Sequence, residues 1–254
     1  EVYNYVKTGE QKREYGTNST AATIHFGNIS ASYEIDSLNL LTASTTFLGY
    51  KADANTQFTN ERWDKNSQLI YKFDNNTTTP GYSHLNIGGR LDYQHKTHLD
   101  GEILTLSYML AATRPHTIFR QTYSNMVNFP VSYTSYDQNT RERFTEHTFQ
   151  IDYVRPFGKY HKIESGTKYI LRYNNSTSLM DYQGTTPDME SKFKHNAQVA
   201  AAYLSYIFTA GKWAARAGLR YEFTRMKASY PDGSNADYHA NLNDWVPSAS
   251  LQYK

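Results

Sequence analysis

Apolar and polar side chains alternate along most of this chain, and a period of two is the pattern of β-strands. In the stretch 213–224, every second residue from Trp213 onward is apolar or aromatic. The residues between them include Arg216, Arg220 and Glu222. One face of this strand is therefore apolar and the other carries charge, as expected for a wall between lipid and an aqueous interior.

The same alternation predicts ten strands. They are placed at 2–14, 20–34, 39–57, 82–95, 102–120, 143–155, 162–182, 193–208, 213–229 and 243–254. Many are longer than the five or six residues usual in globular proteins. A tilted strand needs about 9–11 residues to cross the hydrocarbon of a membrane. The pattern therefore predicts an all-β fold of antiparallel transmembrane strands.

Charged residues recur on the polar face of these strands, and we expect them to point into the interior of a barrel. They are Arg90, Asp92, Asp152, Glu164, Lys168, Arg172, Arg216, Arg220 and Glu222. Asp152, Glu164 and Glu222 among them could form acid–base pairs. With so many Arg and Lys on the same face, charge pairing across neighbouring strands is the simpler interpretation.

The predicted connections alternate in length. Short ones lie at 35–38, 96–101, 156–161 and 209–212, with Asp36, Gly101, Gly158 and Gly211 as turn residues. Longer polar segments lie at 58–81, 121–142, 183–192 and 230–242, and the link at 15–19 fits that class less well. Outer-membrane barrels have short periplasmic turns and longer external loops. We therefore place the four turn residues on the periplasmic side.

The long segments would be external loops that catch a ligand, because aromatic rings stack on sugars or chelates. The candidates for contact with ligand are Trp63, Tyr71, Tyr123, Tyr133 and Tyr136. The alternative is that these rings only pack the loops that carry them.

Composition narrows the class of protein further. The 254 residues have a mean hydropathy of −0.73, yet 15% are aromatic, which does not fit a disordered chain. The net charge of +2, without a clustered basic stripe, gives no reason to expect nucleic acid. Without cysteine, a disulfide scaffold and a thiolate metal site are excluded. A soluble β-sheet binding protein also alternates, but such long strands with charge on one face favour the membrane.

We find no arrangement of residues that indicates an enzyme, and we expect no cofactor. There is no nucleophile elbow, phosphate loop or dinucleotide fingerprint. His84, His116, His147, His195 and His239 would lie near the external rim. A metal chelate could bind there through His116, His147 and His195, although chance placement of nine histidines is the simpler explanation.

Several stretches resemble the barrel domain of TonB-dependent receptors from the Bacteroidetes, the outer membrane protein β-barrel family. They are FQIDYVRPF at 149–157, HKIESGTKY at 161–169, AAYLSYIF at 201–208, GKWAARAGLRYEFT at 211–224, DWVPSASLQYK at 244–254 and DSLNLLTAS at 36–44. The resemblance covers most of the chain. Its motifs, a strand, a short turn with proline and a glycine-rich strand, are moderately specific.

The resemblance implies a bacterial outer-membrane protein that imports a large nutrient, such as a siderophore or glycan. Such receptors have a plug domain inside about 22 strands and draw energy indirectly from the TonB complex. The chain would then be a single barrel segment, 1–254, whose partners are lipid, the plug, the remaining strands and the nutrient. The alternatives are a structural or adhesive surface protein and, with less support, a small-barrel outer-membrane enzyme.

Overall fold

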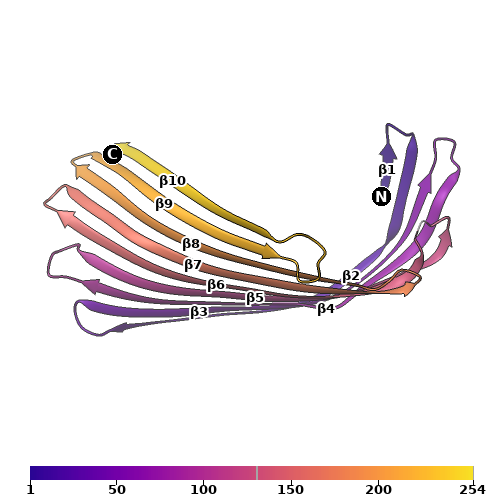
Figure 1. Cartoon of the computed structure of the whole chain (residues 1–254), viewed down its shortest axis with the longest axis horizontal. Helices are drawn as coiled ribbons and strands as arrows, with labels where there is room; N and C mark the ends of the chain where they lie inside the picture. The colour runs from indigo at the N-terminus through magenta and orange to yellow at the C-terminus, as the bar shows by residue number, and fades with distance from the viewer. Residues whose placement is uncertain (130, 254) are drawn as a thin grey trace.

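Ten β-strands form one antiparallel sheet in the computed structural model, which describes residues 1–129 and 131–253. The strands are β1 (Val2–Tyr5), β2 (Glu10–Glu34), β3 (Asn39–Trp63), β4 (Leu69–Lys96), β5 (Ile103–Val127), β6 (Tyr133–Phe157), β7 (His161–Gly184), β8 (Met189–Ala210), β9 (Trp213–Ser229) and β10 (Tyr238–Tyr253). Each strand pairs with its neighbours in sequence, so the sheet is a meander (Figure 1). The predicted antiparallel all-β architecture is confirmed.

The sheet is an open, curved trough, and in the described residues no ladder joins β1 to β10 (Figure 1). No helix in 1–129 or 131–253 is long and apolar enough to cross a membrane.

The predicted start of the sheet is wrong. Residues 15–19 are not a link but lie inside β2, and the first turn lies at 6–9, where Gly9 has a φ of 71°. Glycine is required at Gly16 because a Cβ there would lie 1.9 Å from the carbonyl oxygen of Gln57. The predicted link at 15–19 contains this glycine, whereas close approach of β2 and β3 is what requires it.

The predicted long loops are also wrong in extent. The strands continue through most of them, and the connections are only 64–68, 128–132, 185–188 and 230–237. In β4, the Pro80–Gly81 pair is not a loop boundary but a bulge, where the register with β5 shifts between Thr78 and Ser83. Gly81 has a φ of 78° and donates its N–H to Asp53 Oδ1 at 2.6 Å. Polar strands that leave the membrane look like loops in sequence, because they lack an apolar face.

The predicted short turns are confirmed, at 35–38, 97–102, 158–160 and 211–212. Gly101, Gly158 and Gly211 have φ between 58° and 79°, a conformation that favours glycine. Asp36 closes its turn by accepting the N–H of Leu38 at 2.8 Å. All four turns lie at one end of the sheet, which we call the turn end, at the left of Figure 1. At the other end, which we call the far end, β2 and its neighbours bend away from the rest of the sheet (Figure 1).

The two faces of the sheet differ in chemistry. Directly paired residues share a face, and large apolar side chains on one face are exposed, including Ile29 (71%), Trp245 (65%) and Leu204 (56%). The opposite face is polar and crowded, with Thr148 only 2% exposed. Side chains converge on the concave side of a curved sheet, so the polar face is the inner face. This reverses the arrangement of a soluble protein.

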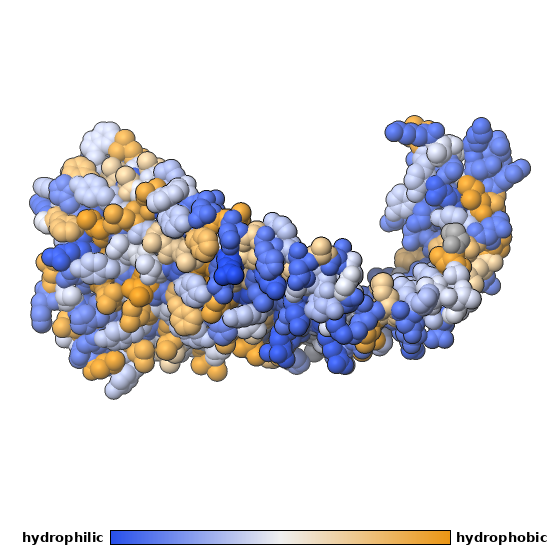
Figure 2. Space-filling model, viewed as in Figure 1, coloured by the Kyte–Doolittle hydropathy of each residue, from blue (hydrophilic) through white to orange (hydrophobic). Residues whose placement is uncertain are grey.

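Exposed apolar side chains on the outer face form a belt next to the turn end. In β9 the belt runs from Trp213 to Phe223, and in β5 from Leu104 to Ala112. These lengths match the 9–11 residues that a tilted strand needs to cross the hydrocarbon. Figure 2 shows hydrophobic side chains gathered toward the turn end and mostly hydrophilic ones across the middle of the sheet. The strands therefore cross the membrane with their turn-end halves and project beyond it with their far halves.

Candidate functional site

The inner face carries all nine charged residues that the alternation placed there. The ladders put Asp92, Ser107, Gln150, Lys168 and Glu222 in one row across the sheet. Eight of the nine bond to another inner-face group, and no partner for Lys168 is found in the described residues. The salt bridges are Arg90–Asp92 (2.6 Å), Arg172–Glu146 (2.5 Å), Arg216–Glu164 (2.9 Å) and Arg220–Glu222 (2.6 Å). Glu146, which the sequence did not single out, lies directly opposite Arg172.

Tyr203 ties three strands together on this inner face. Asp152, Gly166 and Tyr203 occupy one row on β6, β7 and β8. The phenol crosses over Gly166 and donates to Asp152 Oδ1 at 2.5 Å. A Cβ on Gly166 would lie 2.6 Å from the Tyr203 ring. The missing side chain of Gly166 is therefore what allows the ring to reach Asp152.

Eight aromatic rings pack together at the far end, and we call them the aromatic cluster. They are Tyr71, Phe73, Phe119, Tyr123, Phe129, Tyr133, Tyr136 and Tyr182. Neighbouring ring centroids lie 4.2–6.0 Å apart, for example 4.9 Å between Tyr133 and Tyr182. The β6 register with β7 is unbroken from Asp152 to Tyr136, so the cluster shares the inner face with the charges. The sixteen-residue step along β6 from Tyr136 to Asp152 spans about 50 Å.

Two phenols of the aromatic cluster, those of Tyr123 and Tyr136, remain protonated at neutral pH. Burial, with the neighbouring Tyr133 and Tyr136, raises the pKa of Tyr123 to about 12. Burial also raises the pKa of Tyr136. The cluster thus presents apolar ring faces together with the neutral hydroxyl groups of Tyr123 and Tyr136, which can donate hydrogen bonds. Such a surface suits a large, ring-bearing or hydroxyl-rich ligand.

Four of the five aromatic candidates meet in this cluster, although they lie in strands and at strand ends and not in loops. The fifth, Trp63, lies on the outer face beside Arg13 and donates its indole N–H to Glu61 at 3.2 Å. The pKa of the Glu61 carboxyl is lowered, because the hydrogen bond from Lys72 outweighs the opposing effect of burial. The sequence reasoning missed Phe73, Phe119, Phe129 and Tyr182. Aromatic residues two apart at 71 and 73 were a usable signal of a strand there.

The structure does not bring the candidate histidines together. His116 and His147 lie on the outer face, where they bond to Asn139 and Tyr108, whereas His195 lies on the inner face. Throughout 1–129 and 131–253, no group of three or more His, Asp or Glu is arranged to hold a metal ion. A shared chelate site at these three residues does not fit this geometry.

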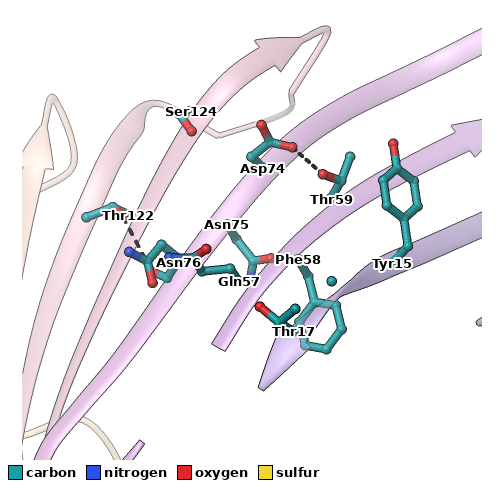
Figure 3. Close-up of a pocket in the computed structure, with 11 residues that line it drawn as sticks. Tyr15, Thr17, Gln57, Phe58, Thr59, Asp74, Asn75, Asn76, Thr122 and Ser124 are labelled. Atoms are coloured by element: carbon teal, nitrogen blue, oxygen red, sulfur yellow. Dashed lines mark hydrogen bonds between the residues drawn. The ribbon is translucent and has the colours of Figure 1, made fainter. Parts of the chain in front are cut away.

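A polar hollow of about 530 Å³ lies between the far halves of β2, β3, β4 and β5 (Figure 3). Thr59 donates to Asp74 at 2.6 Å, and the hydroxyl of Thr122 donates to the carbonyl of Asn76 at 3.4 Å. Hydrogen bonds from Thr59 and Asn125 lower the pKa of Asp74. Asn76 Oδ1 is buried there without a hydrogen-bond partner among the described residues. The Thr59, Asp74 and Thr122 side chains face outward, so this hollow is separate from the aromatic cluster.

The 230–237 connection is held to β8 by Asp232. Its carboxylate accepts the N–H of Lys192 at 2.7 Å and the N–H of Ser234 at 3.0 Å. These bonds lower the pKa of Asp232 to about 2, so the contact is complete above pH 4 and is lost as the pH falls toward 2. We expect Asp232→Ala to increase amide hydrogen exchange in 230–237 at pH 7, with no change in 158–160. Unchanged exchange in 230–237 would contradict this role.

Residues 95–254, which are 160 of the 254, match the outer membrane protein beta-barrel family. The chain belongs to this family. A member of the outer membrane protein beta-barrel family resides in the bacterial outer membrane, and the exposed apolar belt is the surface that contacts lipid there. The soluble alternative is therefore wrong for this barrel protein. A comparison with curated protein sequences gives no match.

Solved structures similar to this barrel protein include two receptors. The siderophore receptor PiuA from Acinetobacter baumannii has 10% identity and a TM-score of 0.43, over 95% of this chain and 47% of that one. The alcaligin outer membrane receptor FauA from Bordetella pertussis has 15% identity and a TM-score of 0.43, over 96% and 41%. This barrel protein thus spans less than half the length of either structure. Similarity at this level does not identify its ligand.

Proposed function

We propose that the chain forms part of the wall of a TonB-dependent outer-membrane receptor, which imports a large nutrient. The nutrient, a siderophore, a glycan or a molecule of similar size, would bind first to the aromatic cluster at the far end. It would then pass along the inner face, inside the complete barrel. The function is transport and involves no catalytic step by this chain.

One observation carries the proposal: the aromatic cluster and the nine charges share the inner face. Tyr123, Tyr133, Tyr136 and Tyr182 lie beyond the level of the lipid, where a ligand arriving from outside would meet them. The nine charges lie within the membrane-spanning halves. Charged side chains at this level would be strongly unfavourable if they faced lipid. A surface protein that only anchors or adheres has no need of both features on the inner side.

The open edges support a larger barrel. β1 covers only residues 10–13 of β2, so most of that edge has no ladder partner, and the outer edge of β10 has none in the described residues. In hydrocarbon each unsatisfied backbone group costs several kcal/mol. We therefore propose that further strands pair with β2 and β10. The enclosed space would hold a plug domain, through which the TonB complex acts.

The connections at the two ends support an orientation. Those at the turn end, such as 158–160 and 211–212, are short and next to the apolar belt. The far halves are polar and continue well past the belt, as external portions of outer-membrane barrels do. We place the turn end in the periplasm and the aromatic cluster outside the cell.

Replacing two rings of the aromatic cluster tests the proposed binding. We expect Tyr123→Ala with Tyr133→Ala to weaken ligand binding at least tenfold, because about 1–2 kcal/mol of ring contact is lost per ring. Binding is measured by calorimetry on the complete protein in detergent. The probes are ferric citrate, a ferric hydroxamate, a ferric catecholate and a set of oligosaccharides.

Trp63→Ala is the matched control, because Trp63 is an aromatic residue at the same end on the outer face. It should leave the affinity unchanged. If the double variant binds a probe as tightly as the parent protein, the cluster only packs the far strands. If the parent protein binds none of the probes, and its loss leaves growth on each of them unchanged, a structural or adhesive role is favoured.

A further inference from the structure

Basic side chains gather on the outer face just beyond the apolar belt, and we call them the outer basic belt. They are Lys51, Arg114, Arg141, Arg143, Lys194, Arg225 and Lys227. All seven are exposed. Because the register along each far half keeps alternate residues on one face, they share the outer face with the lipid-facing residues.

The outer basic belt begins where the apolar belt ends. On β9, Phe223 is the last apolar residue of the outer face, and Arg225 and Lys227 are the next two on that face. On β5, Arg114 directly follows Ala112 on the same face. The apolar stretch on β9 spans roughly 25 Å across a membrane at the usual tilt. The cationic groups therefore lie at the level of lipid head groups.

No acidic side chain of the described protein forms a salt bridge with any of the seven. On β5 and β6 the cations even face one another. The register that pairs His116 with Arg141 places Arg114 directly opposite Arg143. Like charges in opposite positions of a ladder are unfavourable. An anion from outside the chain would offset this repulsion.

The opposite boundary of the apolar belt is different. On its strands, the described outer face has one arginine, Arg155, which lies 3.5 Å from Glu102. Lys159 and Lys212 are in the turns and lie over the rings of Tyr160 and Tyr253. Positive charge without partners is thus concentrated at the boundary next to the far halves. The two leaflets of the membrane meet chemically different surfaces of the protein.

Two adjoining hollows, of about 350 and 380 Å³, open at the outer basic belt between β8, β9 and β10. Arg225 and His239 line both, with Lys227 and Asn196 in one and Asn241 in the other. Phe223, the last apolar residue on the outer face of β9, also lines one of the hollows. Guanidinium, ammonium and amide donors thus surround a space that continues onto an apolar surface. This is the pairing of contacts that a phosphorylated lipid requires.

We propose that the outer basic belt binds phosphate groups on the head groups of lipids in the leaflet next to the far halves. One site is the pair of hollows at Arg225 and Lys227, and the other is the arginine group of Arg114, Arg141 and Arg143. The acyl chains of the bound lipid would lie on Phe223 and the apolar residues below it. The binding depends on the strands crossing the membrane and not on import of a nutrient.

The test removes the charges of the first site in the complete protein, with lipid A that carries two phosphates as the probe. We expect Arg225→Gln with Lys227→Gln to weaken binding at least tenfold, measured by native mass spectrometry in detergent. Arg225→Lys with Lys227→Arg should restore it to within threefold. Lipid A without phosphates should not bind, and 10 mM inorganic phosphate should not displace the bound lipid.

The control variant, Arg120→Gln with Lys192→Gln, also removes two positive charges from the outer face. These residues already pair with Asp137 and Glu190, so lipid binding should change less than twofold. Equal losses in both variants would overturn the proposal, since they would show attraction by net charge alone. Unchanged binding in the first variant, or displacement by inorganic phosphate, would also overturn it. Unfolding temperatures without lipid show whether each variant is assembled.

Discussion

Gly166→Val should be among the most damaging single substitutions in this barrel wall. The new side chain would meet the Tyr203 ring, the carbonyl of Ile151 and the carboxylate of Asp152, all within 2.7 Å of its Cβ. Tyr203 would have to leave its bond to Asp152. Overpacking of this kind costs about 1–3 kcal/mol, to which the loss of a hydrogen bond to a charged group adds about 2 kcal/mol. The free energy of unfolding of the complete protein, measured in lipid vesicles by guanidinium titration, should fall accordingly.

Gly27→Val is the control for that experiment. Gly27 lies in β2, and no atom lies within 4 Å of the position its Cβ would take. A valine there should change the free energy of unfolding by about 0.5 kcal/mol or less. If both variants are equally stable, the ring of Tyr203 does not depend on the open position at Gly166.

Leu106→Arg should destabilise the barrel by about 2–4 kcal/mol near the middle of the membrane. Leu106 lies on the outer face opposite Tyr93 and Ile151, and 40% of it is exposed to the lipid side. The guanidinium would have to enter hydrocarbon or bend toward the head groups. The same guanidinium titration in vesicles measures the loss, and the heat-modifiable band on a gel reports the fraction assembled.

Thr105→Arg is the control for Leu106→Arg. It shows whether the loss of stability comes from placing arginine on the outer face or from the arginine itself. Thr105 is the adjacent residue on β5, lies on the inner face and pairs directly with Asp152. An arginine there would gain a carboxylate neighbour, so stability should change by less than about 1 kcal/mol. Equal loss in both variants would mean that the apolar face does not contact lipid.

The membrane-spanning halves could be predicted from sequence because their two faces meet different solvents. Alternation from Leu104 to Ala112 and from Trp213 to Phe223 is maintained by lipid on one side and polar groups on the other. The turns at Gly101, Gly158 and Gly211 were predictable for a related reason, since their positive φ favours glycine.

The far halves of β4 and β6 could not be predicted, because both of their faces meet polar surroundings. Without a solvent difference the alternation disappears, and a stretch such as 72–79 looks like a loop. Only the backbone ladder shows that it is strand, since hydrogen bonds between strands leave no trace in the order of side chains. Similarly, Gly16 resembles a turn residue in sequence, but its glycine is required by the distance between β2 and β3.

The same difference between the two halves of the strands decides which residues of the candidate site could be predicted. The nine inner charges share one face in the ladders, and each lies in an alternating stretch. The aromatic candidates were chosen as loop residues, so their common face could not be deduced. It follows from an unbroken register along β6 from Asp152 to Tyr136, which brings these two residues to the same side. Trp63 lies on the outer face, so it is not part of the aromatic cluster.

The length of the strands has a consequence for how such a surface can evolve. Where ligand contacts lie on flexible loops, insertions and deletions can reshape the site without disturbing the scaffold. Here Tyr136 and Tyr182 lie opposite each other within a continuous ladder, and Tyr123 pairs with Asn75. One inserted residue upstream would turn every later side chain of that strand to the opposite face. We therefore expect new ligand preferences in this lineage to arise by replacing one side chain with another, with the length of each far half kept constant.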